Sequence, residues 1–585
     1  MKNLNRFRKR NIQTNITHFL LVIFVVAVSV CLITGLFISH LTFKNAVENF
    51  YSNSNLPSLW IETDGIRAED ELLFAEFEYD KRLMFDSKIT FENGEFNTKV
   101  IVSSGETSIP YLIEGEKGSG CYIDSKFIEK HKLGINYSVI SFDYTYAGQT
   151  EKLTFKLLGS MALAEDLAVD DECVLFVDEE VFIEALNYVF PDFGKLDLSA
   201  IEYNQILIRS ELGEEDIEKI QEYYQNSESE LISLKTKDEV SSFQIVENEI
   251  QISQLMLWSF PLLFITVVIL IVVSTISDLV AKERHNIGLL KSLGIKNREI
   301  LSNYCGYGVF MCFVGAVLGV LISPLIVPNM TFETYDIIFN LPHDEVKMVF
   351  PFSLAAIIIF VSVFVGYFSS FFVCLRLMLK TPKECMIGSK KIKLKSRKKS
   401  KNNFGKIGSA FKNMKINRTR TVMSIVGISG CSMLGIIGFG LSLKDGAVKT
   451  NKYLSLEAFL TVFQSFSMVV LCLTILILSM QIFKERSREM AMLRINGKSY
   501  VSIWLSLMIE MLVVVLIGYI VAGLLSYPIL MLMSKLFGIF GEIYISFAGF
   551  LNTFLIVSIV TAVICGFVIV KIYKINLVDS IKFSE

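Results

Sequence analysis

Long apolar runs separated by short polar stretches dominate the chain. Eight of them reach the roughly 20 residues that a helix needs to cross the hydrocarbon core of a membrane. They lie near residues 17–39, 254–279, 303–327, 351–379, 421–443, 457–483, 502–526 and 548–571. This pattern predicts an α-helical polytopic membrane protein with about eight transmembrane helices. The first run is too long for the apolar part of a signal peptide, so we expect an uncleaved anchor.

The eight predicted spans form two sets of four with the same internal order. Each set opens with a basic lead-in, carries a charged, glycine-terminated segment after its second span, and ends in a similar tail. These segments are 5–11, 282–294 and 380–386 in the first set, and 411–418, 484–497 and 574–581 in the second. Three matches in register predict an internal duplication in parallel orientation.

The two sets differ in the loop after their first span. In the first set this loop, 41–253, is long enough for an independently folded domain. Its sequence predicts a mixed α/β domain, because alternating runs indicate strands and amphipathic runs indicate short helices. The expected strands are 96–103, 138–145 and 206–209, and the expected helices are 124–132 and 214–224.

Apolar stripes flank this domain where it meets the membrane. Phe43, Val47 and Phe50 follow span one at helical spacing. A comparable stripe precedes span two and contains Val240, Phe243, Val246 and Ile250. Both spans are therefore predicted to continue as helices that pair into a stalk. The alternative is two separate amphipathic connectors.

Charge orients the predicted spans. The net charge is only −3, but 41–253 is strongly acidic and the loop after span four is densely basic. Positive charge marks the cytoplasmic side, so we expect both termini in the cytoplasm and 41–253 outside a plasma membrane. The Lys-, Asn- and Ile-rich composition favours a bacterial source. The predicted divisions are 1–40 (lead-in and span one), 41–253 (external domain and stalk), 254–380 (spans two to four), 381–420 (basic cytoplasmic linker) and 421–585 (spans five to eight).

The sequence offers no catalytic or metal-binding pattern. It contains no GxxxxGK[ST], GxSxG or HExxH motif, and its five histidines are scattered. We therefore expect no enzyme activity, no metal, no cofactor and no nucleic-acid partner for this chain. Cys121 and Cys173 are the two cysteines of the external segment. They could form one disulfide, but two unpaired core residues are the favoured interpretation.

The two glycine-terminated segments carry the strongest functional signal. Helical spacing places Ile287, Leu290 and Gly294 on one side, and Arg284 and Lys291 elsewhere. Such a helix can lie along the membrane and present an apolar ridge with basic flanks to a cytosolic protein. Its final glycine, like Gly497 in the second copy, suits a helix stop. The alternative is an ordinary positively charged connector.

At these residues the chain resembles the FtsX/MacB-like family of ABC transporter permeases. The second copy, 485–497, resembles the family's E-R-x-R-E-I-x…G signature. The first copy is one residue shorter and has Asn286 where the family usually has glutamate. The lead-ins, the tails and two external stretches, 122–128 and 155–160, are also similar to the family.

The resemblance implies a permease that docks on separate cytosolic ATPases. ATP and Mg²⁺ would bind to those ATPases, one on each coupling segment, and a stalk would pass their motion to a MacB-like periplasmic-core-type external domain. This mode is called mechanotransmission. The residues expected to contact the ATPases are Glu283, Arg284, Leu290 and Gly294, with Glu485, Arg486, Glu489, Leu493 and Gly497.

Two features within the spans are singled out. Glu510 in span seven would be costly if charged and unpaired, so a structural hydrogen bond or a contact near the cytoplasmic end is expected. One face of span five carries small residues that suit close helix contact. They are Gly427, Cys431, Gly435, Gly438 and Ser442. The resemblance implies a permease dimer interface at the first spans, and generic packing is an equal alternative.

Three functional hypotheses follow. The leading one is export or extraction of a peptide, lipid or other amphiphile. The acidic domain would attract cationic peptides, including antimicrobial ones, or would simply stay soluble. The second is a non-transporting transmembrane protein that regulates a cell-wall hydrolase or a sensor kinase. A secondary transporter is disfavoured, because polar groups are scarce in the spans and no inverted repeat is present.

Overall fold

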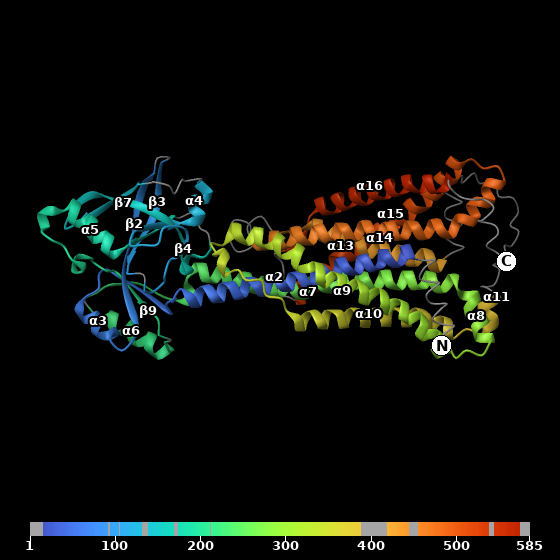
Figure 1. The fold of residues 1–585 in the computed structure, drawn as a ribbon, viewed down its shortest axis with the longest axis horizontal. Coiled ribbons are helices and arrows are strands. Elements are labelled where there is room, and N and C mark those ends of the chain that lie inside the picture. The colour runs from blue at the N-terminus through green and yellow to red at the C-terminus, as the bar shows by residue number, and fades with distance from the viewer. Residues whose placement is uncertain are drawn as a thin grey trace. The chain divides into compact units, whose positions relative to one another are not determined.

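The fold is described from a computed structural model of the chain (Figure 1). The structure describes residues 16–91, 94–104, 106–131, 139–168, 173–210, 212–227, 229–387, 418–443, 454–536 and 543–573. The predicted lead-ins, the second tail and most of the basic linker lie outside these residues.

The chain divides into two compact units. The first, here the helical unit, comprises 1–39, 253–331 and 350–585. The second, here the sheet unit, comprises 40–252 and 332–349. The sheet unit therefore contains the predicted external segment together with a second stretch, 332–349, that lies between predicted spans three and four.

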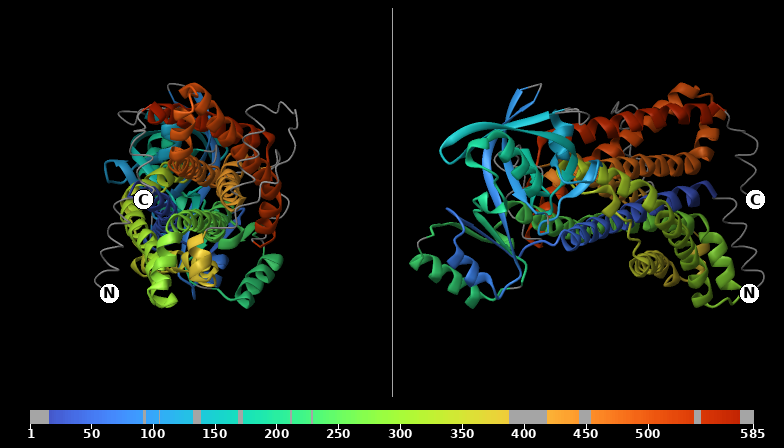
Figure 2. Two further views of the ribbon diagram at one scale, coloured as in Figure 1. Left: turned by 90° about the vertical axis from the view of Figure 1, so that its right-hand side faces the viewer. Right: turned by 60° about the vertical axis from the view of Figure 1, so that its left-hand side comes forward.

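Long apolar helices make up the helical unit (Figures 1 and 2). They are α2 (Ile16–Asn53), α7 (Ser241–Lys282), α9 (Asn297–Ile338), α10 (Phe352–Met378), α13 (Arg418–Gly440), α14 (Leu454–Ile495), α15 (Tyr500–Leu536) and α16 (Phe547–Tyr573). Within the described residues, six of these are long and apolar enough to cross a membrane. Two shorter apolar helices, Ser424–Gly440 and Thr461–Ile477, lie where spans five and six are expected. The polytopic helical class is confirmed, and a total of eight spans stays a prediction.

Glycines bring the helices of each half into close contact. A Cβ at Gly319 of α9 would lie 2.5 Å from the carbonyl oxygen of Ala27 in α2. In the second half, a Cβ at Gly518 of α15 would lie 2.8 Å from Ile428 in α13. The first and third helices of both halves thus approach each other at a glycine of the third helix. This likeness agrees with the predicted parallel duplication.

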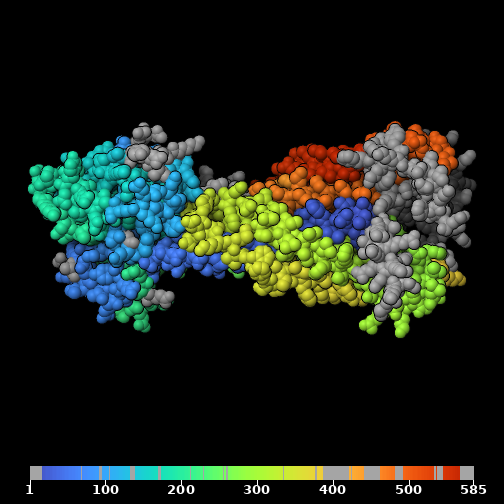
Figure 3. Space-filling model, in the orientation of Figure 1, coloured from blue at the N-terminus to red at the C-terminus, as the bar shows by residue number. Residues whose placement is uncertain are grey.

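Helix α10 packs against α9 in the same way, and the two lie side by side on the visible face of the unit (Figure 3). A Cβ at Gly366 of α10 would lie 2.6 Å from the carbonyl oxygen of Gly308 in α9. Side chains any larger than hydrogen would separate the two backbones at this point.

The second half has a short two-stranded ribbon between segments that follow α13 and precede α16. Strand β11 (Leu441–Leu443) pairs antiparallel with β12 (Ile543–Ile545). The amide of Ser546 also donates to the carbonyl oxygen of Gly440 at 2.6 Å. The prediction that Ser442 continues the helical face of span five is therefore wrong, because α13 ends at Gly440 and Ser442 pairs in a strand.

A ten-stranded sheet forms the sheet unit. Its strands are β1 (Leu59–Thr63), β2 (Tyr79–Phe91), β3 (Gly94–Ser103), β4 (Tyr111–Gly115), β5 (Cys121–Asp124), β6 (Val139–Tyr146), β7 (Gln149–Ala162), β8 (Cys173–Asp178), β9 (Gln205–Ile208) and β10 (Leu231–Thr236). The order is β10-β1-β9-β2-β3-β8-β5-β7-β4, and β6 pairs with both β2 and β7. Strands β2, β3, β8, β5, β7 and β6 therefore close into a ring. The predicted strands at 96–103, 138–145 and 206–209 are confirmed as β3, β6 and β9.

Two of the apolar cores on this sheet are covered by short helices. Helices α4 (Ser125–His131) and α5 (Glu179–Val189) cover the larger one, and α3 (Ala68–Phe74) and α6 (Glu214–Asn226) cover the smaller one. The predicted helices at 124–132 and 214–224 are confirmed as α4 and α6. Cys121 and Cys173 are both fully buried in the larger core as free thiols, which agrees with the favoured interpretation.

The helical stalk is confirmed for both flanking spans. Helix α2 runs through the whole first stripe, and α7 begins at Ser241 and contains every residue of the second stripe except Val240. Phe43, Phe50 and Phe243 are buried. The rings of Tyr51 in α2 and Phe243 in α7 meet edge to face at 5.0 Å. Paired helices, rather than separate connectors, therefore lead into the sheet.

A third helix joins this stalk. The ring of Tyr335 in α9 stacks on Phe43 at 4.3 Å between centroids. Just beyond α9, the Asn340 side-chain amide donates to Asp124 at 2.9 Å and to the carbonyl oxygen of Met161 at 3.2 Å, and its oxygen accepts from Ser125 at 2.5 Å. The end of α9 and the following loop are thus fastened to the sheet, which explains why 332–349 belongs to this unit.

Candidate functional site

The two glycine-terminated segments both lie at the C-terminal ends of long helices. In the first copy, the helix breaks at Glu283, and a separate helix α8 (Arg284–Ser292) follows α7. In the second copy, α14 continues unbroken to Ile495. The copies therefore have the same place in each half but differ in how their helix is attached.

Both copies end in the same backbone motif. Gly294 and Gly497 have φ angles of 83° and 81°, in the left-handed region that favours glycine. The next amide in each copy reaches back five residues: the Ile295 amide donates to the carbonyl oxygen of Leu290 at 3.2 Å, and the Lys498 amide donates to that of Leu493 at 3.1 Å. This is a Schellman cap, and it confirms that both glycines stop their helices.

The structure places Glu283 inside the protein. Its side chain is only 7% exposed, and it accepts a hydrogen bond from the Tyr304 hydroxyl of α9. A carboxylate held this way cannot reach a docking protein directly. Its role here is to fix the start of α8 to α9.

A further short helix, α11 (Pro382–Ile387), packs against α8. Arg284 donates to the carbonyl oxygen of Glu384 at 2.7 Å, and the Lys291 ammonium donates to the carbonyl oxygens of Met378 and Lys380 at 3.0 and 2.9 Å. A Cβ at Gly288 would lie 2.7 Å from Met386. The basic side chains on the flanks of this segment therefore hold α8 within the chain: Arg284 binds α11, and Lys291 binds the end of α10.

A different face of α8 is exposed. His285, Asn286, Leu289 and Leu293 are all exposed, with Leu289 at 49% and Leu293 at 71%. This exposed face differs from the ridge of Ile287, Leu290 and Gly294 that the sequence predicted. The signal was the spacing of Leu289 and Leu293 at i and i+4, opposite the buried Ile287.

The second copy repeats this arrangement when the two are aligned on their final glycines. Seven residues before the glycine, Ile287 and Met490 are buried at 0% and 3% exposure. Five residues before it, Leu289 and Met492 are each 49% exposed. Each half therefore presents one apolar side chain at the same position of its capped segment.

The other predicted residues of the second copy fall into two groups. Leu493 packs beside a small core of Met490, Ile503 and Leu507, so it supports the segment from within. The side chains of Glu485, Arg486 and Glu489 lie outside the described residues, although their backbone belongs to α14.

The small face of span five is covered within the same chain. The Cys431 thiol donates to the Thr474 hydroxyl of α14 at 3.1 Å. A Cβ at Gly435 would lie 2.8 Å from Thr553 of α16, and one at Gly438 would lie 2.9 Å from Ser467 of α14. Gly427 is buried as well. Packing among the helices of the second half therefore accounts for these residues.

Glu510 is buried in α15 with 8% of its surface exposed. It lies on the same helix as Ile503 and Leu507, the core residues that support the second capped segment. The expected structural role of Glu510 stays a prediction.

Comparison with known families identifies both membrane segments. A family model described as FtsX-like permease C-terminal matches residues 258–382 and again residues 461–577. Comparison with curated proteins gives no match. One model that matches twice, in the same direction, covers spans two to four and six to eight, and each match includes one capped segment.

Proposed function

The chain belongs to the FtsX-like permease family through both of its membrane segments, and on that premise we propose that it is the permease of an ABC transporter complex. Members of this family are membrane permeases that work with ABC ATPases and are generally not enzymes themselves. ATP and Mg²⁺ would bind to the separate ATPase subunits in the cytoplasm. The chain would span a bacterial plasma membrane with both termini inside and the sheet unit outside.

The observation that carries the proposal is the repeated capped segment. Leu289 and Met492 occupy the same position before the two glycines and are equally exposed. An apolar side chain fixed on a rigid, capped helix suits a groove on a partner protein. Because one chain supplies both segments, the complex would contain one permease chain and two ATPase chains.

Contacts behind α8 support a coupling role. Tyr304 ties the start of α8 to α9, while Lys291 ties its end to the last carbonyls of α10. A force applied to α8 would therefore reach α7, α9 and α10 together. Glu283, Arg284 and Lys291 act as positioning residues for this helix.

The far ends of the same helices support transmission to the sheet unit. Helices α2, α7 and α9 each contribute residues to both units. Their sheet-unit portions are bound to one another by the Phe43–Tyr335 and Tyr51–Phe243 ring contacts. ATP-driven motion of the spans would thus move the sheet unit. The cargo would be a peptide, lipid or other amphiphile, with cationic antimicrobial peptides favoured by the acidic surface.

The test is co-purification with a candidate ATPase after changing the exposed ridge. Burying a leucine-sized side chain contributes about 1.5–3 kcal/mol, so Leu289→Asp combined with Met492→Asp should weaken binding at least about tenfold. Stimulation of ATP hydrolysis by the permease should fall with it. Leu198→Asp is the matched control, because Leu198 is also 49% exposed but belongs to the sheet unit. Full binding and coupled hydrolysis in the double variant would contradict the proposal.

A second candidate function uses the same machinery without transport. The fastening of three helices to one sheet suits the control of an external cell-wall hydrolase or a membrane sensor kinase. Cargo movement into or out of vesicles, measured with the ATPase present, separates the two functions. Stimulated hydrolysis without any cargo movement would favour the regulatory one.

A further inference from the structure

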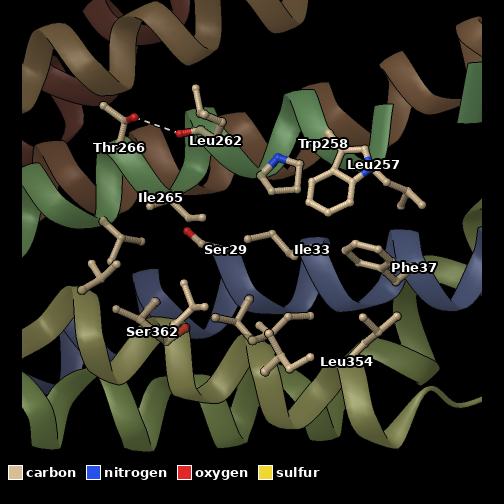
Figure 4. A pocket seen from close by; sticks show the side chains of 18 residues that line it. Ser29, Ile33, Phe37, Leu257, Trp258, Leu262, Ile265, Thr266, Leu354 and Ser362 are labelled. Carbon is tan, nitrogen blue, oxygen red and sulfur yellow. Dashed lines mark hydrogen bonds between the residues drawn. The ribbon is translucent and has the colours of Figure 1, made fainter. Parts of the chain in front are cut away.

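A lateral groove of about 520 Å³ opens between α2, α7 and α10 (Figure 4). Its floor is α2, where Val26, Ser29, Val30 and Ile33 are buried. Its mouth carries exposed apolar side chains from the two walls. They are Trp258 and Leu262 of α7, at 66% and 57% exposure, with Ile357 and Val361 of α10, at 55% and 39%.

The groove lies along the first half of α10, before the close contact of this helix with α9. The backbones of α9 and α10 are in close contact at Gly308 and Gly366. The groove residues of α10, from Leu354 to Val365, all precede that contact. The groove therefore separates this side of the first half of α10 from α2 and α7.

The lining selects a hydrocarbon ligand. No charged side chain lines the groove among the described residues, and its surface is almost entirely apolar. The Ser29 hydroxyl donates to the carbonyl oxygen of Val25 at 2.9 Å, and the Thr266 hydroxyl donates to that of Leu262 at 2.8 Å. Ser362 of α10 supplies the third hydroxyl of the lining. Because the hydroxyls of Ser29 and Thr266 are satisfied within their own helices, they offer little to a polar ligand.

The position of the groove indicates that this hydrocarbon comes from the membrane. All three lining stretches lie within apolar runs long enough to span a membrane, so the mouth opens into the surrounding acyl chains. Trp258 lies near the start of the apolar run of α7, a level at which tryptophan commonly meets lipid head groups.

We propose that this groove is a binding site for one acyl chain of a membrane phospholipid. The chain lies along α2 between α7 and α10, with its head group at the level of Trp258. Because the chain fills the space between α10 and the two stalk helices, its presence fixes their separation. The inference rests on the proposed function only for placing the groove in the outer leaflet.

Photo-crosslinking in liposomes tests the site. The full chain is reconstituted with a phospholipid that carries a diazirine near the end of one acyl chain, and adducts are mapped by mass spectrometry. Adducts are expected on 26–33 of α2, whose buried residues form the floor. The exposed face of α16, where Ile559 is 61% exposed, reports ordinary contact with surrounding lipid.

Two substitutions at the floor decide whether the chain enters. Ser29→Phe fills the groove and should lower the α2 adducts about tenfold while leaving the α16 adducts unchanged. Ser29→Ala should leave both unchanged. If Ser29→Phe does not fold, Ile358→Trp fills the same space from the α10 wall and is expected to have the same effect.

Three results would overturn the site: no adducts on α2, α2 adducts that persist in the filled variants, or adducts that form only when an acylated peptide is supplied. The last would make a lipid-modified cargo the ligand in place of a phospholipid. No ATPase is needed for this experiment, so its failure would leave the proposed docking untouched. Conversely, a failure of the ATPase-docking experiment would not contradict the acyl-chain site.

Discussion

At the residue scale, one buried ion pair joins separate parts of the sheet unit. Arg82 of β2 binds the Glu165 carboxylate through both terminal nitrogens, the second at 3.0 Å, and the Trp60 indole of β1 donates to the same carboxylate at 2.8 Å. Both charged side chains are largely buried, at 4% and 10% exposure. Trp60 in turn packs against Phe243 of the stalk. Glu165 therefore links β1 to β2, and Trp60 connects this pair to the start of α7.

This pair predicts a loss of stability in acid. Burial alone would raise the pKa of Glu165, but the Arg82 charge and the hydrogen bonds outweigh it and hold the pKa below its ordinary value of 4.5. A lowered pKa stabilises the fold fully above pH 4.5, and that contribution disappears as the pH falls through the lower folded value. In Glu165→Gln, the free energy of unfolding should fall less steeply as the pH is lowered. Unfolding followed by the fluorescence of Trp60 measures this.

The same substitution should also destabilise the sheet unit at neutral pH. Breaking a buried ion pair leaves an uncompensated charge on Arg82 and costs about 3–5 kcal/mol. Glu129→Gln is the control, because the Glu129 side chain is 69% exposed in its pair with Lys126. Equal stability of the two variants would contradict the role of Glu165.

At the scale of elements, α11 is the support on which α8 rests. A larger side chain at Gly288 would meet Met386 and the backbone of α11. Gly288→Val should push the two helices apart at a cost of about 1–3 kcal/mol, since overpacking a filled contact is destabilising. Amide hydrogen exchange in 382–387 should become faster and coupled ATP hydrolysis weaker. Ser292→Val is the control, because it changes an exposed position of the same helix. Hydrogen exchange in 382–387 should then be as slow as in the unchanged protein.

The loop after α9 gives a second prediction at this scale. The Asn340 side chain donates a hydrogen bond to the Asp124 carboxylate. Burial raises the pKa of Asp124, and the hydrogen bonds from nearby backbone amides and from Asn340 lower it part of the way back. Asn340→Ala should raise the pKa of Asp124 further and speed hydrogen exchange in 339–349. Glu345→Ala removes only the exposed bond to Asn53. Exchange as slow as in the unchanged protein would show that Asn340 does not fasten the loop.

The sequence predicted elements better than their contacts. Periodicity located the long helices, three strands and both caps, because burial of one face and a left-handed glycine are local properties. It did not place Glu283, since a charge beside a membrane end is equally compatible with docking and with a bond to Tyr304 of another helix. Nor did it find the attachment of 332–349, which depends on Asn340 meeting residues more than 170 positions away.

At the scale of the whole molecule, the two halves share a plan but differ at their ends. The first carries the sheet unit and a separate, braced α8, whereas the second carries the β11–β12 ribbon and an unbroken α14. Asn286 also occupies the position of Glu489 when the copies are aligned on their glycines. We therefore expect the two ATPase contacts to differ in strength. Leu289→Asp and Met492→Asp, compared singly, should weaken ATPase binding by unequal factors in a titration.

The most direct measurement of the central claim is the mass of the intact complex formed with its ATPase. One permease chain bearing two docking segments predicts a complex with two ATPase chains, whose number falls to one when either Leu289 or Met492 is changed to aspartate. A complex that holds two permease chains, or that keeps both ATPases in each single variant, would contradict the account.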